Sequence, residues 1–259
     1  MRPIQIMKQI PNLFTLLNLI LGCVAIIFIL QTGESVLNYN GEEWKVYLPE
    51  KIQWGAICIF LAAVVDFLDG FIARLMKADS SMGKQLDSLA DVVSFGVAPG
   101  LIMYQLLRIS YAYEPGGIDT PLAYLLPALL LPASAAWRLA RFNIDPEQSN
   151  GFKGVPAPAG GLFIASLPLI ALYNYFGLQE WLLNKYVLYV IILLVSYLMV
   201  STLPLMNIKF RNFVFSQNWP KYLIILAGIV CGILFQWLAV PVVFILYIIL
   251  SLLSQNKTA

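Results

Sequence analysis

The chain has 259 residues, of which 60% are hydrophobic and only 12% are charged. A soluble protein of this length needs more polar residues to cover its surface, so the composition indicates an integral membrane protein. The absence of histidine excludes imidazole bases, histidine-activated nucleophiles and histidine-ligated metals. The net charge of +2 gives no indication of nucleic-acid binding, and we expect no nucleic-acid partner.

Eight apolar stretches are long enough to be membrane-spanning helices. They lie near residues 11–31, 52–70, 86–107, 121–140, 158–176, 185–203, 219–236 and 238–254. The short segment "FQWLAVP" between the last two predicts a tight hairpin broken near Pro241. We therefore expect an all-α integral membrane protein with about eight transmembrane helices. It should form one domain over residues 1–259, with a core over about 8–203 and an additional helix hairpin over about 219–254.

Lysine and arginine in short loops set the orientation of such a chain. If the N-terminus is cytoplasmic, twelve of the sixteen basic residues lie inside: Arg2, Lys8, Arg74, Lys77, Lys84, Arg138, Arg141, Lys153, Lys209, Arg211, Lys221 and Lys257. The four outside are Lys45, Lys51, Arg108 and Lys185. This bias predicts that both termini face the cytoplasm, and it places the turn between the second and third spans on that side.

That turn carries aspartates at helical spacing in "DFLDGFIARLMKADSSMGKQLDSLAD". Asp66 and Asp69 are three apart and Asp87 and Asp91 are four apart, so each pair shares one helix face. Carboxylates gathered at a membrane interface repel one another, and hard divalent cations relieve that repulsion. Oxygen ligands suit Mg²⁺ or Mn²⁺ and are compatible with Ca²⁺. Two such ions would clamp a diphosphate.

The residues between the two pairs suit a phosphate or a nucleotide. Gly70 and Ala73 remove bulk from the helix face beside the carboxylates. Arg74 is always charged and presents paired donors to phosphate oxygens. By contrast, Asp79 sits in the polar turn and is expected to be a solvated helix cap.

The full pattern is Asp66-x2-Asp69-Gly70-x2-Ala73-Arg74-x8-Gly83-x3-Asp87-x3-Asp91. It resembles the signature of the CDP-alcohol phosphatidyltransferase family at every specified position, and the resemblance covers at least residues 1–160. It implies a membrane fold with a two-metal site at the cytoplasmic end. Members move a phosphatidyl group from CDP-diacylglycerol to an alcohol and release CMP.

The resemblance also implies roles for individual residues. Asp66, Asp69 and Asp87 would be metal ligands, and Asp91 would contact the second metal and act as general base. The residues implied for the CDP pocket are Asp66, Gly70, Ala73, Arg74 and Gly83, the last of which would give the nucleotide room.

The first span, which contains "PNLFTLLNLILG", adds two polar residues to this pocket. Thr15 and Asn18 are three apart within an apolar helix, where polar groups need partners. Hydrogen bonding between helices would explain them equally well. Because similar family members use this segment beside the nucleotide, we expect Thr15 and Asn18 to bind CDP.

Three further stretches bear on the acceptor alcohol: "SFGVAPG", "SAAWRLARFNID" and "GFKGVPAPAGG". They resemble the membrane-embedded phosphatidylserine synthases of the family, which implies L-serine as acceptor. Arg138 and Arg141, three apart, and Asn143 would hold its carboxylate. The arginines would equally hold the phosphate of glycerol 3-phosphate or serve as cytoplasmic anchors of the helix.

The expected reaction is direct in-line attack, with Asp91 taking the proton of the serine hydroxyl. A cation-coupled transporter is the alternative from another class, but transporters place carboxylates near the bilayer midplane, often in repeated halves. The expected partners are CDP-diacylglycerol, L-serine, the lipid bilayer and a second copy of the chain in a homodimer. The expected location is the inner membrane, with the active site at the cytoplasmic face.

Overall fold

The structure is a computed structural model that describes residues 10–31, 38–39, 44–45, 48–76, 80–114, 117–145, 152–174, 176–206 and 215–255. Its helices are α2 (Ile10–Leu30), α3 (Lys51–Met76), α4 (Ser81–Asp91), α5 (Ala98–Ala112), α6 (Leu130–Ile144), α7 (Ala157–Tyr173), α8 (Gln179–Leu182), α9 (Lys185–Val200), α10 (Phe215–Phe235) and α11 (Ala239–Gln255). A π-helical segment, Val92–Val97, joins α4 to α5. Short 3₁₀ turns are Gly117–Asp119, Leu122–Tyr124, Leu126–Leu129 and Gln236–Leu238.

Two short antiparallel strand pairs accompany the helices. β1 (Asn38–Tyr39) pairs with β2 (Trp44–Lys45). β3 (Phe152–Lys153) pairs with β4 (Pro204–Leu205), so that Phe152 lies opposite Leu205. The second pair brings the chain before α7 against the chain after α9.

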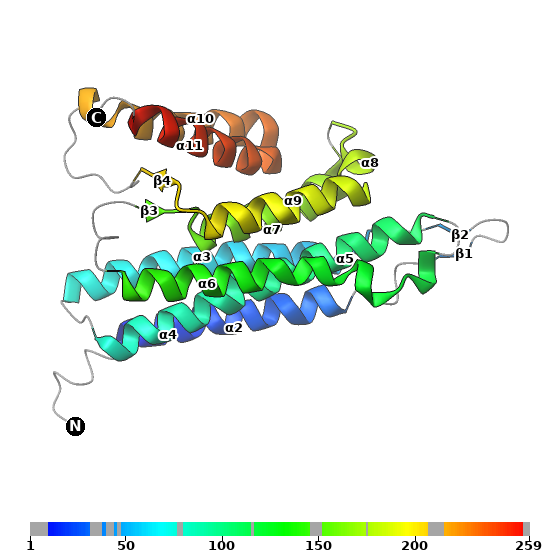
Figure 1. The fold of residues 1–259 in the computed structure, drawn as a ribbon, viewed down its shortest axis with the longest axis horizontal. Helices are drawn as coiled ribbons and strands as arrows, with labels where there is room; N and C mark the ends of the chain where they lie inside the picture. The colour runs from blue at the N-terminus through cyan, green and yellow to red at the C-terminus, as the bar shows by residue number, and fades with distance from the viewer. Residues whose placement is uncertain are drawn as a thin grey trace.

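The long helices run roughly side by side along one axis (Figure 1). α2 packs against α3 and α4, α3 against α7, and α6 against α9. Their shared interior is apolar: Ala25, Ile59, Ile102 and Ile164 are fully buried. The hairpin of α10 and α11 packs through α11 against α7 and β4.

The outer faces of the bundle are apolar as well. Four segments of the described chain are long and apolar enough to cross a membrane: Ile10–Leu30, Lys51–Met76, Ser81–Ala112 and Asn218–Leu253. Two shorter apolar helices are Ala157–Tyr173 and Lys185–Val200. Large side chains such as Ile20, Leu193 and Ile233 are more than half exposed. Apolar residues inside and outside the bundle identify an integral membrane protein, whose outer faces are solvated by lipid.

The structure differs from the sequence expectation at two boundaries. The stretch expected as a helix from residue 121 begins with 3₁₀ turns, and α6 starts only at Leu130. Pro121 precedes the first of those turns and Pro127 lies in the second, and prolines lack the backbone donors that a regular helix needs. The C-terminal hairpin turns at Gln236, whose φ is +50°, rather than near Pro241. Pro241 instead lies in the first turn of α11, a position that tolerates proline.

Basic residues lie at both ends of the bundle, and helix direction decides at which end each one lies. α3 begins at Lys51 and carries Arg74 in its last turn, so these two residues lie at opposite ends of one helix. Lys185 begins α9, while Arg141 lies in the last turn of α6. The described start of α2 and the end of α11 both lie at the end of the bundle where α3 finishes (Figure 1). Some of the expected charges lie outside the described residues: Arg2, Lys8, Lys77, Lys209, Arg211 and Lys257, together with Asp79.

Candidate active site

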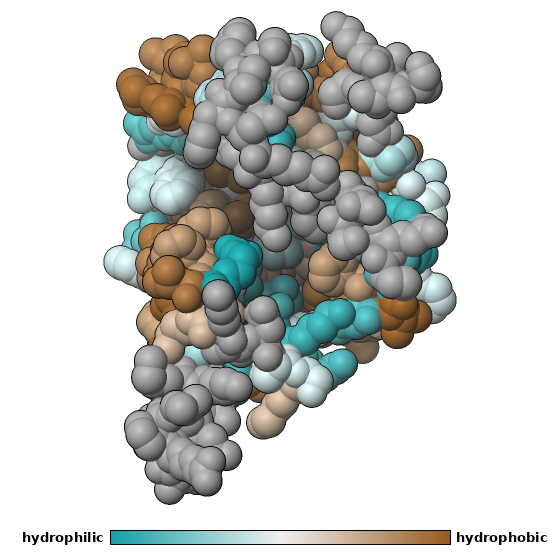
Figure 2. Space-filling view, turned by 90° about the vertical axis from the view of Figure 1, so that its left-hand side faces the viewer, coloured by the Kyte–Doolittle hydropathy of each residue, from teal (hydrophilic) through white to brown (hydrophobic). Residues whose placement is uncertain are grey.

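A polar pocket lies where α2, α3 and α4 meet, at one end of an otherwise apolar bundle. Figure 2 looks onto this end and shows hydrophilic side chains near its centre with hydrophobic ones beside them. The cavity has a volume of about 550 Å³. Its lining combines residues of the first span with both halves of the aspartate motif: Pro11, Asn12, Thr15, Asp69, Gly70, Ala73, Arg74, Ser80, Ser81, Gly83, Lys84 and Asp87.

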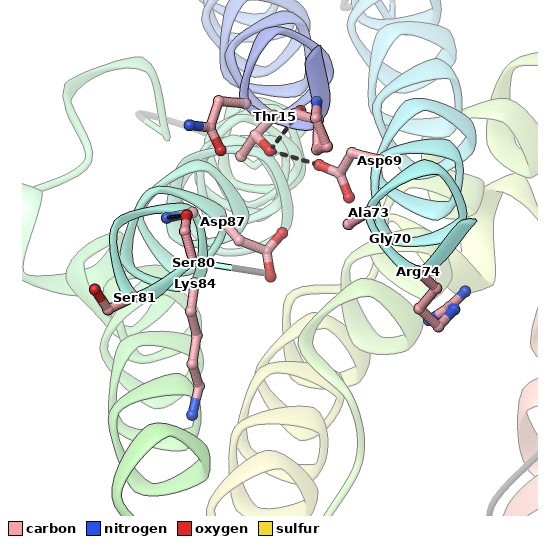
Figure 3. Close-up of a pocket in the computed structure, with 12 residues that line it drawn as sticks. Thr15, Asp69, Gly70, Ala73, Arg74, Ser80, Ser81, Lys84 and Asp87 are labelled. Carbon is pink, nitrogen blue, oxygen red and sulfur yellow. Dashed lines mark hydrogen bonds between the residues drawn. The ribbon is translucent and has the colours of Figure 1, made fainter. Parts of the chain in front are cut away.

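The aspartates of the motif come together from two helices beside this pocket, and two of them, Asp69 and Asp87, line it. Ligand oxygens of Asp66, Asp69 and Asp87 all lie within 4.8 Å of one another. The carboxyl group of Asp66 also lies within hydrogen-bonding reach of Asp91, which is only 6% exposed. Asp69 and Asp87 face each other across the gap between α3 and α4 (Figure 3). Carboxylate oxygens in such a group suit a hard divalent cation, and the set therefore fits a metal site.

Helix α2 contributes hydrogen bonds to this carboxylate group. The Thr15 hydroxyl donates to Asp69 Oδ2 over 2.8 Å (Figure 3). Asn18 Nδ2 donates to Asp91 Oδ1 over 3.3 Å. Both donors are buried, with Thr15 at 4% and Asn18 at 0% exposure. Asn18 Oδ1 is buried without a hydrogen-bond partner in the described part of the chain. The two polar residues of the first span thus face the aspartates rather than another part of the bundle.

Glycine and a helix cap shape the two sides of the pocket. A Cβ on Gly70 would meet only Arg74 Nη1, at 3.7 Å, so the missing side chain leaves open space in the cavity. A Cβ on Gly83 would lie 2.9 Å from Ser80 Oγ and 3.0 Å from Asn12 Oδ1. Ser80 caps α4 by accepting a hydrogen bond from the Gly83 amide over 2.9 Å. Gly83 therefore permits close packing of α4 on α2 as well as room in the pocket.

A π-helical turn follows Asp91 directly. It spans Val92–Val97 and contains most of the "SFGVAPG" stretch. Ser94 Oγ donates to the Asn18 carbonyl over 3.0 Å, and a Cβ on Gly22 would collide with Ser94. Compared with a regular α-helix, the wider turn rotates the side chains that follow it relative to those that precede it. It therefore sets the direction in which the buried end of α4 presents Asp91 to α2.

The three residues expected to bind the acceptor have different surroundings. Arg138 is 6% exposed, interacts electrostatically with Asp91, and keeps its Nε without a hydrogen-bond partner among the described residues. Arg141 Nη1 instead donates to the Val200 carbonyl at the end of α9, over 2.8 Å. Asn143 Nδ2 donates to Ser88 Oγ over 2.8 Å, which ties the end of α6 to α4. Of the three, Arg138 interacts with the aspartate group through its charge, while Arg141 and Asn143 hydrogen-bond to α9 and α4.

The family model described as CDP-alcohol phosphatidyltransferase matches residues 8–198, which contain every residue of the pocket. The chain belongs to this family. This CDP-alcohol phosphatidyltransferase has a candidate site built from both halves of the family's aspartate motif. The stretch that the family model matches ends at residue 198, before α10 begins.

Relatives from distant organisms are similar over different parts of this phosphatidyltransferase. A Bacillus subtilis protein is 32% identical over 69% of this chain and 89% of its own length. A Helicobacter pylori protein is 31% identical over 90% of this chain and 84% of its own. A Mycobacterium leprae protein is 38% identical over 48% of this chain, and the chain spans only 39% of that protein. All three are named CDP-diacylglycerol–serine O-phosphatidyltransferase.

The pocket also contains polar residues that the motif does not specify. Lys84 and Arg74 extend from α4 and α3 on opposite sides of the pocket (Figure 3). Lys84 Nζ donates to the Asn143 carbonyl over 3.2 Å, which links the pocket to the end of α6. The sequence could have placed Lys84 in the pocket, because it directly follows Gly83 and lies three residues before Asp87, and residues three apart on a helix share a face. No spacing in the sequence marked Ser81 as a residue of the pocket.

Proposed function

We propose that the chain transfers the phosphatidyl group of CDP-diacylglycerol to the hydroxyl group of L-serine and releases CMP. The observation that carries this proposal is the grouping of Asp66, Asp69 and Asp87, with Asp91 beside Asp66, at a pocket that Asp69 and Asp87 line in a chain of this family. The names of the Bacillus and Helicobacter relatives support serine as the acceptor. The two substrates are therefore a liponucleotide and a small zwitterion.

We assign Asp66, Asp69 and Asp87 as the residues that hold divalent metal, with Asp91 contacting a second ion. The grouping of their oxygens within 4.8 Å and the all-oxygen donor set support Mg²⁺ or Mn²⁺, and are compatible with Ca²⁺. When bound, such cations supply positive charge that neutralises the diphosphate and the departing CMP. Thr15 donates to Asp69, which would restrict the orientation of that carboxylate.

In the proposed reaction, Asp91 takes the proton from the serine hydroxyl group. The serine oxygen then attacks the phosphorus atom that bears diacylglycerol, and the bond from that phosphorus to the CMP oxygen breaks. Asn18 donates to Asp91 Oδ1, so it would hold the other oxygen toward the acceptor. The absence of histidine speaks against a histidine-bound phosphatidyl intermediate, so attack is direct.

The donor and acceptor would bind on different sides of Asp91. Gly70, Ala73 and Gly83 leave room for the cytidine and diphosphate, and Arg74 supplies charge for a phosphate oxygen. On the other side, the buried Arg138 suits the carboxylate of serine. We assign Arg141 and Asn143 to the support of that region through their contacts with Val200 and α4.

We also propose the membrane arrangement. The chain would cross the bilayer about eight times as a single domain, with a core over residues 8–203 and a hairpin over 219–254. Both termini and the active site would face the cytoplasm at the inner membrane, in accord with the distribution of lysine and arginine. The proposed assembly is a homodimer, which light scattering of the purified protein in detergent would test.

CMP release by the purified protein in detergent tests the function. The reactions contain CDP-diacylglycerol and Mn²⁺ or Mg²⁺, with L-serine, glycerol 3-phosphate, myo-inositol phosphate or no acceptor. We expect release with serine and none after EDTA treatment. Release with glycerol 3-phosphate instead would keep the chemistry and overturn the acceptor. No release with any acceptor from folded protein would overturn the proposed function.

A further inference from the structure

A second cavity lies at the end of the bundle away from the aspartates. The end of α5, the short helix α8 and the start of α9 meet there, opposite the end that carries α4 (Figure 1). The cavity has a volume of about 410 Å³. Its lining is largely polar and includes Tyr113, Glu114, Glu180, Asn184, Lys185 and Tyr186. The proposed reaction uses none of these residues, so the cavity is separate from the candidate active site.

The charges that line this cavity do not balance. Lys185 Nζ donates to Glu114 Oε2 over 2.7 Å, and it lies 5.0 Å from the ring centroid of Tyr111 and 5.4 Å from that of Tyr186. These contacts hold the lysine in the wall of the cavity and offset its charge with that of Glu114. The carboxylate of Glu180 makes no ion pair with another described residue. The cavity therefore carries one negative charge in excess.

Aromatic side chains surround this end of the bundle. Tyr113, Tyr124 and Trp181 are each more than half exposed. Tyrosine and tryptophan favour the level of the lipid headgroups, where the ring contacts apolar chains and the polar atom reaches water. The cavity therefore lies at the headgroup level of the leaflet at this end of the bundle.

An apolar stripe on α9 leads from the cavity toward the middle of the bilayer. Tyr186 lines the cavity, and Val190, Leu193 and Tyr197 follow it at spacings of three or four residues. All four are more than half exposed, and this spacing places them on one face of the helix. The stripe provides a path for the acyl chain of a lipid whose headgroup occupies the cavity.

We propose that this cavity binds the headgroup of a zwitterionic phospholipid that carries a primary amine. The ammonium group donates to Glu180 and lies beside the tyrosine rings of the lining. The phosphate of the same headgroup accepts a hydrogen bond from Asn184 Nδ2, because Asn184 Oδ1 already accepts one from the Tyr186 amide. The excess negative charge disfavours an anionic lipid without an amine. This lipid is a bound ligand and no substrate, since the aspartates lie at the other end of the bundle.

Melting temperatures of the lipid-depleted protein in detergent test the proposal. EDTA is present and both substrates are omitted, so the only added ligand is phosphatidylethanolamine, phosphatidylcholine or phosphatidylglycerol. We expect phosphatidylethanolamine to reach half-maximal stabilisation at a concentration about tenfold lower than phosphatidylglycerol does. Phosphatidylcholine, whose methylated amine has no N–H donor, should require more lipid than phosphatidylethanolamine. Equal requirements for phosphatidylethanolamine and either other lipid would overturn the proposal.

Glu180→Gln locates the bound headgroup, because it removes one exposed carboxylate and keeps the shape of the side chain. The phosphatidylethanolamine requirement should rise about tenfold, as expected for the loss of a hydrogen bond between charged groups, while CMP release in detergent stays unchanged. Asp119→Asn removes an exposed carboxylate near the same end of α5 but outside the cavity, and should behave like the wild type. A preference for phosphatidylethanolamine that survives in Glu180→Gln would place the lipid elsewhere and overturn the site.

Discussion

The Thr15 hydroxyl donates to Asp69 Oδ2 over 2.8 Å, which joins the first membrane helix to the aspartate motif across 54 residues of sequence. Both residues are buried, at 4% and 6% exposure. A hydroxyl that donates to a ligand carboxylate fixes which oxygen is left for a cation. In the proposed metal site, this bond would therefore orient a ligand carboxylate as well as join two helices.

Replacing Thr15 with valine should weaken metal binding without unfolding the helix, because valine has nearly the same shape. The metal concentration for half-maximal CMP release should rise about tenfold, as expected for the loss of a hydrogen bond to a charged group. Thr15→Ser retains the hydroxyl and should behave like the wild type. Equal metal requirements for Thr15→Val and Thr15→Ser would contradict the role of this bond.

Asp91→Asn should lower turnover at least about 100-fold, because the amide cannot take the serine proton. Binding of CDP-diacylglycerol, measured by displacement of a labelled analogue, should remain detectable. Asp119→Asn changes an exposed carboxylate outside the pocket and is the control. Turnover of Asp91→Asn within a fewfold of wild type would remove Asp91 from the role of general base.

Gly70→Ala should weaken CDP-diacylglycerol binding while leaving the melting temperature equal or slightly higher. The added methyl would enter the cavity, since its nearest protein neighbour is Arg74 Nη1 at 3.7 Å. Alanine also favours a helix over glycine by up to about 1 kcal/mol. Gly228→Ala, where the nearest atom is Val243 Cγ2 at 3.9 Å, should change neither binding nor catalysis. A Gly70→Ala enzyme with normal donor binding would show that the cavity near Gly70 does not hold the nucleotide.

Divalent metal should stabilise the protein even in the absence of substrates. A ligand present at about 100 times its Kd adds roughly 2.7 kcal/mol to the free energy of unfolding, so Mn²⁺ should raise the melting temperature and EDTA should reverse the rise. Asp66→Ala should abolish both the rise and the activity, whereas Asp119→Asn should keep both. A rise of equal size in Asp66→Ala would place the metal elsewhere in the protein.

Arg138 and Arg141 should respond differently to substitution, although they are three apart on α6. Arg138→Ala should raise the KM for serine more than the KM for the lipid. Arg141→Ala removes the hydrogen bond to the Val200 carbonyl and should lower the free energy of unfolding by about 1–3 kcal/mol with little change in either KM. Melting temperatures and steady-state kinetics of the two variants provide the comparison. A rise in the lipid KM alone would assign Arg138 to the donor.

Local pattern was sufficient to predict several of the helices and the grouping of aspartates between them. Apolar runs predicted α2, α3 and α7 because a span of about 20 apolar residues has few other stable forms in a bilayer. The three- and four-residue spacings predicted that each aspartate pair shares a helix face, since that follows from helix geometry alone. The start of α6 and the turn at Gln236 were misplaced, because several prolines and apolar residues there permit more than one boundary.

The amino-acid sequence by itself determined the membrane class, the family and the pairing of aspartates on helix faces, all of which depend on composition and short-range spacing. Only the tertiary structure decided which distant partners meet. Asn18 reaches Asp91 across 73 residues, and Asn143 reaches Ser88 across 55 residues. These contacts depend on how separate helices pack, and periodicity within one helix carries no information about the side chain that a neighbouring helix presents.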